Sequence, residues 1–329
     1  MDITAQQTLL HALNGFARTH VLAAAIRLGL PEAMGAEAPV EQLGRDLGIS
    51  PDRLSRLLRA LVQLDICTEP RPGVYAPTEA GALLRADHPA SLHAMAELII
   101  GPLTQRPWTR LEHTIRTGSC GFEEEFGEPV FEYFAARPEA TELYNTAMGE
   151  STRDVAAALL DAYDFDGIGQ VADIGGGNGT LLAAILRGVP RLTGVLFDTV
   201  HGTAQAAGVL ADVRDRCAIR HGDFFESVPT GADLYLLKNI LHDWDDDRAE
   251  AILRGIAAAL PAHGRLLLVE QVITGRDPFF ADLTMLVLYG GRERTAADLA
   301  LLCERAGLTL TSTLPLPTTL GFSVLEVRR

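Results

Sequence analysis

The sequence has few cysteines, one lysine and no long apolar run. Its four cysteines, Cys67, Cys120, Cys217 and Cys303, are scattered and form no CxxC pair. This spacing indicates buried thiols in a reducing compartment, and it excludes a zinc site and a disulfide framework. No uncharged apolar segment reaches the roughly 18–20 residues of a membrane span, and the amino terminus is not of signal-peptide type. We therefore expect a cytoplasmic protein with no membrane partner and no metal.

Positive charge is also scarce. The formal net charge is −15, and Lys238 is the single lysine of the chain. A surface this acidic repels phosphate backbones and anionic lipid, so nucleic acid is not expected as a partner. The same surface suits a positively charged ligand, although a negative surface more often serves solubility alone.

The amino-terminal part has the pattern of a winged helix. A short helix is predicted from Glu41 to Gly48, and Ser50 followed by Pro51 begins a second helix. The apolar face of that second helix is formed by Leu54, Leu57, Leu58, Leu61 and Val62. A short hairpin around residues 66–75 follows it and completes the pattern.

A winged helix admits two functions, DNA binding and dimerisation. Residues 1–100 hold eight arginines and eleven acidic residues, whereas a DNA reader usually presents a basic face. The apolar stretch Val21–Leu30 predicts an exposed face that needs a partner. We therefore favour a homodimer formed through this region, with a DNA regulator as the alternative.

From about residue 166 onward, short apolar runs alternate with helical patterns. The runs that predict strands are 170–174, 194–198, 234–238 and 265–272. This alternation is typical of a parallel, doubly wound sheet. Two later runs, 308–313 and 320–327, predict a hairpin that closes the sheet at its edge.

A glycine-rich turn follows the first of these strands and opens a helix. Residues 171–180 are Val-Ala-Asp-Ile-Gly-Gly-Gly-Asn-Gly-Thr, and glycines in such a turn let a ligand lie against the backbone. A dinucleotide fingerprint requires glycine or alanine where Thr180 stands. Asp173, two residues before Gly175, does not favour a pyrophosphate. Its carboxylate can engage the turn and the ammonium group of an amino-acid tail.

Two further acids follow later strands. Asp198 ends the run 194–198, the position from which a carboxylate binds ribose hydroxyls in nucleoside-binding folds. Asp223 can accept from an adenine amino group, with Phe224 against the ring. The alternatives are a helix-capping role for Asp198, and an ordinary turn beside core aromatics for Asp223 and Phe224.

The run 234–238 ends in Lys238, and His242 follows one turn later. Ligands bind at the carboxyl ends of strands in open α/β sheets. A lone histidine is more often structural, but this one lies beside Lys238, Trp244 and a group of acids. The segment is therefore a candidate site of chemistry.

These motifs together resemble the plant-type O-methyltransferases, which include caffeate- and flavonoid-type enzymes and bacterial natural-product relatives. The resemblance is carried by Asp-Ile-Gly-Gly-Gly-Asn-Gly, Gly-Asp-Phe-Phe, Leu-Lys-Asn-Ile-Leu-His-Asp-Trp, and Gly-Gly-Arg-Glu-Arg-Thr at 290–295. It covers nearly the whole chain. It implies an α/β fold in three parts: an all-helical winged-helix dimerisation domain at 1–95, a helical linker at 96–165, and a Rossmann-like class I methyltransferase domain at 166–329.

The resemblance implies S-adenosylmethionine as cofactor, S-adenosylhomocysteine as product and no metal. The candidate cofactor-binding residues are Ser151, Asp173, Gly175, Gly177, Asp198, Asp223, Phe224 and Lys238. It also implies His242 as the general base, flanked by Glu270 and Glu293. An unperturbed imidazole has a pKa of about 6.5 and is mostly the free base at neutral pH. Either glutamate can fix the tautomer of the His242 imidazole. The alternative is that Glu270 is a surface acid at the end of a strand and that Glu293 forms a salt bridge within a loop.

The linker and the loops supply candidates for binding the acceptor. These are Trp108, Phe131, Tyr144, Met148, Asp243, Phe280, Asp282 and Met285. The apolar ones suit a planar organic molecule, and each is as readily a core residue. The two acids either bind the acceptor or orient neighbouring groups.

This sequence departs from the family pattern at two points. Thr199-Val200 follows Asp198 where the family usually has Leu-Pro, and the loop between Glu270 and Met285 is shorter than in the plant enzymes. The first change bears on the local adenosine geometry, and the second reshapes the acceptor pocket.

The sequence therefore predicts a methyltransferase that acts by in-line transfer on a hydroxyl, most simply a phenolic one. The acceptor is expected to be a small, hydrophobic aromatic or polyketide-like natural product. The alternatives keep the cofactor but change the chemistry to N- or C-methylation or to a reaction without methyl transfer. A cofactor-sensing winged-helix regulator is the alternative from another class.

Overall fold

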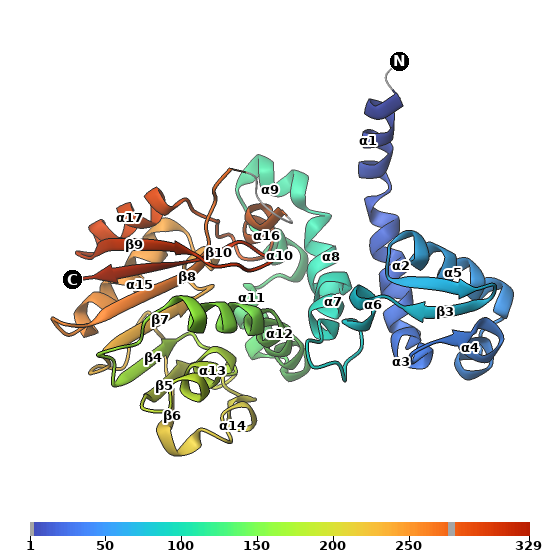
Figure 1. Ribbon diagram of the computed structural model, residues 1–329. Coiled ribbons are helices and arrows are strands. Elements are labelled where there is room, and N and C mark those ends of the chain that lie inside the picture. Colours follow the sequence, from blue (N-terminus) through green and yellow to red (C-terminus); the bar gives the residue numbers. More distant parts are fainter. Residues whose placement is uncertain (1–2, 276–279) are drawn as a thin grey trace. The chain divides into compact units, whose positions relative to one another are not determined.

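A computed structural model describes residues 3–275 and 280–329 of the chain (Figure 1). The chain divides into two compact units, with the boundary between Gln105 and Arg106. The predicted division at residues 95 and 165 stays a prediction. No helix within the described residues is long and apolar enough to cross a membrane.

The first unit is mostly helical and contains the expected winged helix. Its helices are α1 (Ile3–Leu13), α2 (Gly15–Arg27), α3 (Leu30–Met34), α4 (Val40–Leu47), α5 (Pro51–Gln63), α6 (Glu79–Ala82) and α7 (His93–Ile100). Its strands are β1 (Ala38–Pro39), β2 (Cys67–Arg71) and β3 (Val74–Pro77), in the order β1-β3-β2. Ser50 precedes α5 as predicted but makes no side-chain capping hydrogen bond.

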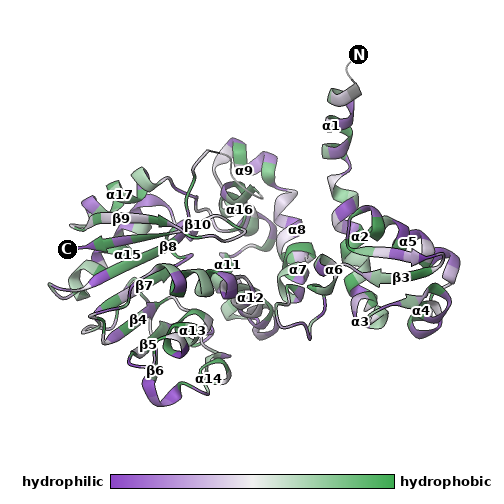
Figure 2. Ribbon diagram, in the orientation of Figure 1, coloured by the Kyte–Doolittle hydropathy of each residue, from purple (hydrophilic) through white to green (hydrophobic). Residues whose placement is uncertain are grey.

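The prediction that Val21–Leu30 presents an exposed face is wrong. Ala25, Ile26 and Leu30 are at most 4% exposed, because α2 packs against α3, α5 and α7 of its own unit. Leu28 of this stretch is 40% exposed, but a group of more exposed large apolar side chains lies earlier in the chain: Leu9, Leu10, Leu13 and Phe16. Figure 2 shows that hydrophobic and hydrophilic residues alternate along α1.

The sheet of the second unit is doubly wound. Within the described residues it has seven strands in the order β6-β5-β4-β7-β8-β10-β9. The strands are β4 (Gln170–Ile174), β5 (Thr193–Asp198), β6 (Cys217–His221), β7 (Leu234–Lys238), β8 (Arg265–Gln271), β9 (Thr309–Pro315) and β10 (Phe322–Arg328). Strands β6, β5, β4, β7 and β8 pair in parallel, whereas β10 is antiparallel to both β8 and β9. The predicted closing hairpin is confirmed.

Helices precede, connect and flank these strands. They are α8 (Pro102–Trp108), α9 (Leu111–Thr117), α10 (Gly121–Phe126), α11 (Val130–Ala135), α12 (Pro138–Ala162), α13 (Thr180–Gly188), α14 (Ala206–Val209), α15 (Asp246–Ala259), α16 (Ala281–Leu288) and α17 (Ala296–Arg305). The described residues also include two short 3₁₀ turns, η1 (Arg214–Arg216) and η2 (Leu241–Asp243).

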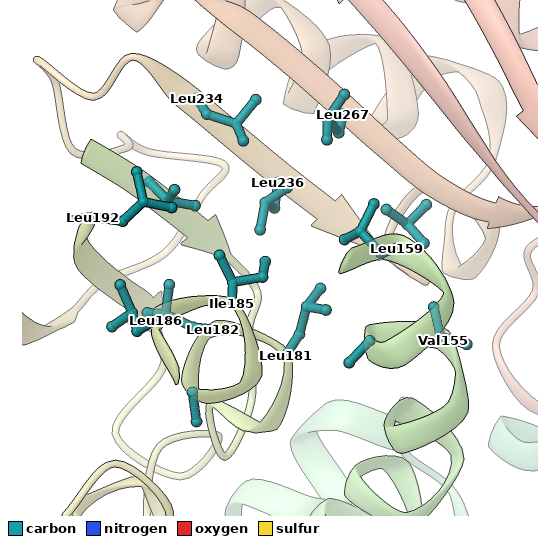
Figure 3. Close-up of a cluster of buried hydrophobic side chains, with 14 of the residues drawn as sticks. Val155, Leu159, Leu181, Leu182, Ile185, Leu186, Leu192, Leu234, Leu236 and Leu267 are labelled. Atoms are coloured by element: carbon teal, nitrogen blue, oxygen red, sulfur yellow. The ribbon is translucent and has the colours of Figure 1, made fainter. Parts of the chain in front are cut away.

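Alternate residues of each central strand enter separate cores on the two faces of the sheet. In β7, Leu234 and Leu236 pack with α12 and α13, whereas Tyr235 and Leu237 pack with α15 and α17. Figure 3 shows the first of these cores, in which Leu159 of α12 and the leucines of α13 lie beside β7. Burial on both faces explains the continuous apolar runs of the sequence, and it fixes the carboxyl ends of the strands on which the site is built.

Candidate active site

The glycine-rich turn after β4 is closed on one side and open on the other. Gly175, Gly177 and Gly179 all have positive φ, at 68°, 56° and 81°, a conformation that glycine adopts without steric cost. A Cβ placed on Gly175 would lie 2.5 Å from Ile240 Cδ1. A Cβ on Gly177 would meet nothing within 4 Å. A ligand can therefore approach the backbone at Gly177.

Two carboxylates lie beside this turn. Asp198 Oδ2 accepts the Gly177 N–H at 2.8 Å, and its Oδ1 accepts the Thr199 N–H at 2.6 Å. Asp173 is only 1% exposed, and its Oδ2 has no hydrogen-bond partner among the described residues. Burial, aided by the charge of Asp198, raises the pKa of Asp173 to about 7, although Lys238 opposes the rise.

The single lysine lies at the end of β7, close to the same acids. Burial lowers the pKa of Lys238 to about 8, while Glu270 and Asp173 act in the opposite direction. Its Nζ also lies 5.3 Å from the centre of the Phe322 ring. Lys238 therefore compensates the buried carboxylates between the glycine turn and the His242 segment.

Helix α12 packs directly against the glycine turn. Asn178 of the turn donates its side-chain amide to the Asn145 carbonyl at 3.0 Å. A Cβ on Gly149 would lie 2.8 Å from Asn178 Nδ2, so any larger residue there would displace the Asn178 amide. Ser151, on the same helix, donates its hydroxyl to the Met148 carbonyl at 2.9 Å. Sequence reasoning missed Asn145 and Gly149, because no motif marks a helix residue that packs on a distant turn.

The other predicted nucleoside contacts lie at different depths. Phe224 is half-buried, and its Cε1 is 3.5 Å from the position of a Cβ on Gly175. Asp223 is exposed, and its Oδ1 accepts the Phe225 N–H at 2.8 Å. An open glycine turn, a buried carboxylate oxygen without a partner and an aromatic face fit a nucleoside that carries a cationic amino-acid tail.

His242 lies in the turn η2 and is surrounded by three carboxylates. Its Nδ1 is 2.9 Å from Glu293 Oε1 and 4.0 Å from Glu270 Oε2. Its Nε2 is 3.5 Å from Asp243 Oδ1. All four side chains are buried. Because Glu293 takes up Nδ1, Nε2 is the nitrogen available for proton transfer.

The two glutamates have different partners. Glu270 Oε1 accepts the backbone N–H groups of Ile240 and Leu241, at 3.1 and 3.0 Å. These bonds hold the start of η2, directly after Asn239, which has a positive φ of 55°. Glu293 bonds to the ring itself, and its own N–H donates to Asp282 Oδ1 at 2.9 Å. Glu270 therefore contacts the backbone of the turn, whereas Glu293 contacts the imidazole.

The carboxylates control the protonation of His242. Burial alone lowers the pKa of the imidazole, but Asp243, Glu270 and Glu293 together raise it to about 10. The expectation of a mostly neutral imidazole at pH 7 is therefore wrong for the site formed by the protein alone. Sequence reasoning placed Glu270 and Glu293 beside the ring but took the ordinary pKa of histidine, because it could not give the distances from the acids to the ring nitrogens.

Aromatic rings gather beside this charged cluster. Phe131 of α11 stacks on Trp244 with ring centres 5.6 Å apart and lies 5.8 Å from Tyr289. Tyr144 of α12 meets Phe131 edge to face at 6.5 Å. Burial raises the pKa of both Tyr144 and Tyr289, and the charge of Asp243 adds to the rise. Sequence reasoning named Phe131 and Tyr144 but missed Trp244 and Tyr289 as members of this group.

The remaining acceptor candidates are not joined to this group by ring contacts. Phe280 is 68% exposed at the start of α16. Trp108 shares no ring contact with the group within the residues that the structure describes. Met148 and Met285 are half-buried, on α12 and α16. The role of these four residues stays a prediction.

Family models match most of the chain. An O-methyltransferase domain matches residues 108–309, and an O-methyltransferase dimerisation domain matches residues 10–87. The chain is similar to a phenazine O-methyltransferase of Lysobacter antibioticus, with 42% identity over 97% of this chain and 95% of the relative.

Solved structures agree with these matches. A mitomycin 7-O-methyltransferase is 35% identical, with a TM-score of 0.90 over 99% of this chain and 98% of the neighbour. An O-methyltransferase from neocarzinostatin biosynthesis is 32% identical, with a TM-score of 0.79 over 97% and 98% of the two chains. It was solved with S-adenosylmethionine and 2-hydroxy-5-methyl naphthoic acid.

Proposed function

The chain belongs to the O-methyltransferase family, and we propose that it methylates a phenolic hydroxyl of a small aromatic or polyketide-like natural product with His242 as general base. It is an S-adenosylmethionine-dependent enzyme of natural-product biosynthesis, as predicted. The observation that carries the proposal is the 2.9 Å contact between His242 Nδ1 and Glu293. This contact leaves Nε2 to act on an acceptor hydroxyl.

Different residues of the site have different proposed roles in the reaction. When bound, S-adenosylmethionine supplies a methyl group that is already electrophilic. The residues proposed to bind it are the open turn at Gly177 and the carboxylates of Asp173 and Asp198. Phe131, Tyr144 and Trp244 orient a planar acceptor. His242 accepts the hydroxyl proton at Nε2 as the oxygen becomes nucleophilic, a contribution of roughly 10²–10⁴-fold in rate.

Protonation of His242 limits this step. The surrounding carboxylates keep the proton on the imidazole at neutral pH, and a protonated ring cannot accept another. The rate should therefore rise with pH. Glu293 stabilises the imidazolium that forms after proton transfer, as carboxylates do for the histidine of catalytic triads.

The direct test compares His242→Gln with the unchanged protein, using relatives' acceptors such as a phenazine or hydroxynaphthoate phenol. We expect kcat to fall by roughly 10²–10⁴-fold while the Kd for S-adenosylmethionine stays close to its original value. Titration calorimetry measures the binding. Retained turnover in His242→Gln would remove the histidine from the mechanism, and lost cofactor binding would assign it a structural role.

We also propose that the protein is a homodimer formed through its first unit. The dimerisation model matches residues 10–87. The exposed apolar residues Leu9 and Leu13 are four positions apart and lie on one side of α1, and the exposed Phe16 follows at the start of α2. A second copy of the chain is the partner that covers them.

A further inference from the structure

We infer that Arg294 is a positioning residue, whose guanidinium fixes the turn that carries His242. Arg294 is 2% exposed and lies one residue beyond the Glu293 that bonds to the imidazole. The inference rests on the proposed function, because it explains how the proposed base is held at one geometry.

The guanidinium bonds to the His242 segment on both sides of the histidine. Its Nη1 donates to the Leu241 carbonyl at 2.7 Å, and its Nη2 donates to the Trp244 carbonyl at 2.8 Å. Its Nε and Nη2 both donate to Oδ1 of Asp246, at 3.0 and 2.7 Å. One rigid, planar group therefore ties together residues 241, 244 and 246.

The backbone around Arg294 lies against the same turn. The Arg292 N–H donates to the His242 carbonyl at 2.9 Å. A Cβ on Gly291 would lie 2.1 Å from that carbonyl oxygen, so only glycine permits the approach. The Ile273 N–H in turn donates to the Arg294 carbonyl at 3.0 Å, close to the end of β8. The segment 291–294 is thus held from the sheet side and itself holds the turn.

Arginine has the chemistry that this position requires. Its guanidinium stays protonated and presents its donors in a fixed plane, whereas the ammonium group of lysine donates from a single point. Lysine at 294 would keep the charge next to Asp246 but could not reach both carbonyls at once. The segment would then move relative to Glu293, and the ring–carboxylate contact would change with it.

Three side chains from two elements, β8 and the segment 291–294, therefore converge on η2. Glu270 from β8 binds the N–H groups at its start, Arg294 binds the carbonyls on both sides of His242, and Glu293 binds the ring. A base must be held within a fraction of an ångström of its working position, and a displacement of about 1 Å can cost about 10²-fold in rate.

The test uses two variants, each with a matched control. Arg294→Lys removes the planar donor set, and its control Arg292→Lys changes an exposed arginine whose Nη1 is 3.9 Å from the same Asp246. Asp246→Asn removes the carboxylate that the guanidinium contacts. Its control Asp247→Asn removes the same charge from the same first turn of α15, at a side chain that is 99% exposed.

Three readouts separate positioning from folding. These are the Kd for S-adenosylhomocysteine, kcat per cofactor-binding site, and the downfield NMR resonance of the His242 Nδ1 proton, assigned with His242→Gln. In Arg294→Lys we expect kcat to fall about 10²-fold, with KM and Kd little changed and the resonance shifted. Asp246→Asn should give a smaller change in the same direction, and both controls should behave as the unchanged protein.

The possible outcomes are distinct. An unchanged kcat and an unmoved resonance in Arg294→Lys would overturn the inference, as would equal losses in Asp246→Asn and Asp247→Asn. If Arg294→Lys does not fold, the Asp246→Asn pair decides the question. If the unchanged protein methylates no acceptor, the proposed function fails, while the Nδ1 resonance still tests the link between Arg294 and His242.

Discussion

Replacing Glu293 by glutamine should lower the pKa of His242 without removing the hydrogen bond to the ring. The amide oxygen of glutamine can still accept from Nδ1, so the substitution removes only the negative charge that lies 2.9 Å away. Asp243 and Glu270, at 3.5 and 4.0 Å from the ring nitrogens, remain in place.

The magnitude follows from the kind of contact that is changed. A hydrogen bond to a charged group contributes about 1.5–3 kcal/mol, against about 0.5–1.5 kcal/mol for a neutral one. The difference of roughly 1–1.5 kcal/mol corresponds to about one pH unit in a pKa. The pKa of His242, raised to about 10 in the unchanged protein, should therefore fall by about one pH unit in Glu293→Gln.

The assay is an NMR titration of protein labelled with ¹⁵N-histidine, with the His242 signal assigned by its absence in His242→Gln. Glu304→Gln, which removes one charge from an exposed side chain, is the control and should leave the titration unchanged. A His242 pKa near the ordinary value in the unchanged protein would refute the reasoning. An equal pKa in the unchanged protein and Glu293→Gln would refute it as well.

The same difference should appear in catalysis. The pH dependence of kcat/KM reports the ionisations of the free enzyme and the free substrate. An acceptor phenol ionises at the same pH with either enzyme. The rise in kcat/KM that follows deprotonation of His242 should occur at lower pH in Glu293→Gln. Comparison of the two profiles on one acceptor therefore isolates the histidine.

Other perturbations test separate parts of the molecule. Asp198→Asn should raise the Kd for S-adenosylmethionine about ten- to a hundredfold, because hydrogen bonds to a neutral amide are weaker than those to a charged carboxylate. Calorimetry measures this Kd. Leu236→Ala, at a fully buried position of β7, should lower the free energy of unfolding in urea by about 2–5 kcal/mol. The double variant Leu13→Asp with Phe16→Asp should convert dimers to monomers in light scattering. The folded protein binds the His242 proton more tightly than the unfolded chain, so stability should fall as the pH rises from about 6.5 to about 10, and less so in His242→Gln.

Three of these predictions have a contrary outcome that would overturn a specific assignment. A Kd unchanged in Asp198→Asn would place the cofactor away from the glycine turn. Dimers that persist in the Leu13 and Phe16 double variant would assign the contact to other residues, and Gln7→Asp, at an exposed position of α1, controls for added charge. A stability that does not decline above neutral pH would mean that the carboxylates do not raise the pKa of the histidine.

Sequence reasoning found most readily the strands that are buried on both faces of the sheet. Strands β4 and β7 were predicted at the residues where they occur, because burial on both faces requires a continuous apolar run. Strand β6 was missed because it lies at the edge of the sheet and most of its residues are exposed. The other edge strand, β9, is mostly exposed as well, but it was predicted as one half of the closing hairpin.

The composition of the site was predictable, but its internal contacts were not. The motifs placed His242, Glu270 and Glu293 together as candidates, yet they gave no means of telling the two glutamates apart. That difference depends on where β8 ends and on how closely the segment 291–294 approaches the turn. The close approach at Gly291 and the guanidinium of Arg294 are tertiary contacts, and local sequence carries no signal for them.

The proposed base and two of the residues proposed to bind the acceptor come from different elements of this fold. His242 is fixed by β7, β8 and the segment 291–294, all tied to the sheet, whereas Phe131 and Tyr144 come from the helices α11 and α12. A change in an aromatic side chain of these helices alters the shape offered to an acceptor and leaves the bonds that hold the base intact. Substitutions at Phe131 should therefore change KM and the choice of acceptor, whereas substitutions at Arg294 should change kcat with every acceptor. A variant of Phe131 that lowered kcat equally for all acceptors would show that the two sets of residues are coupled.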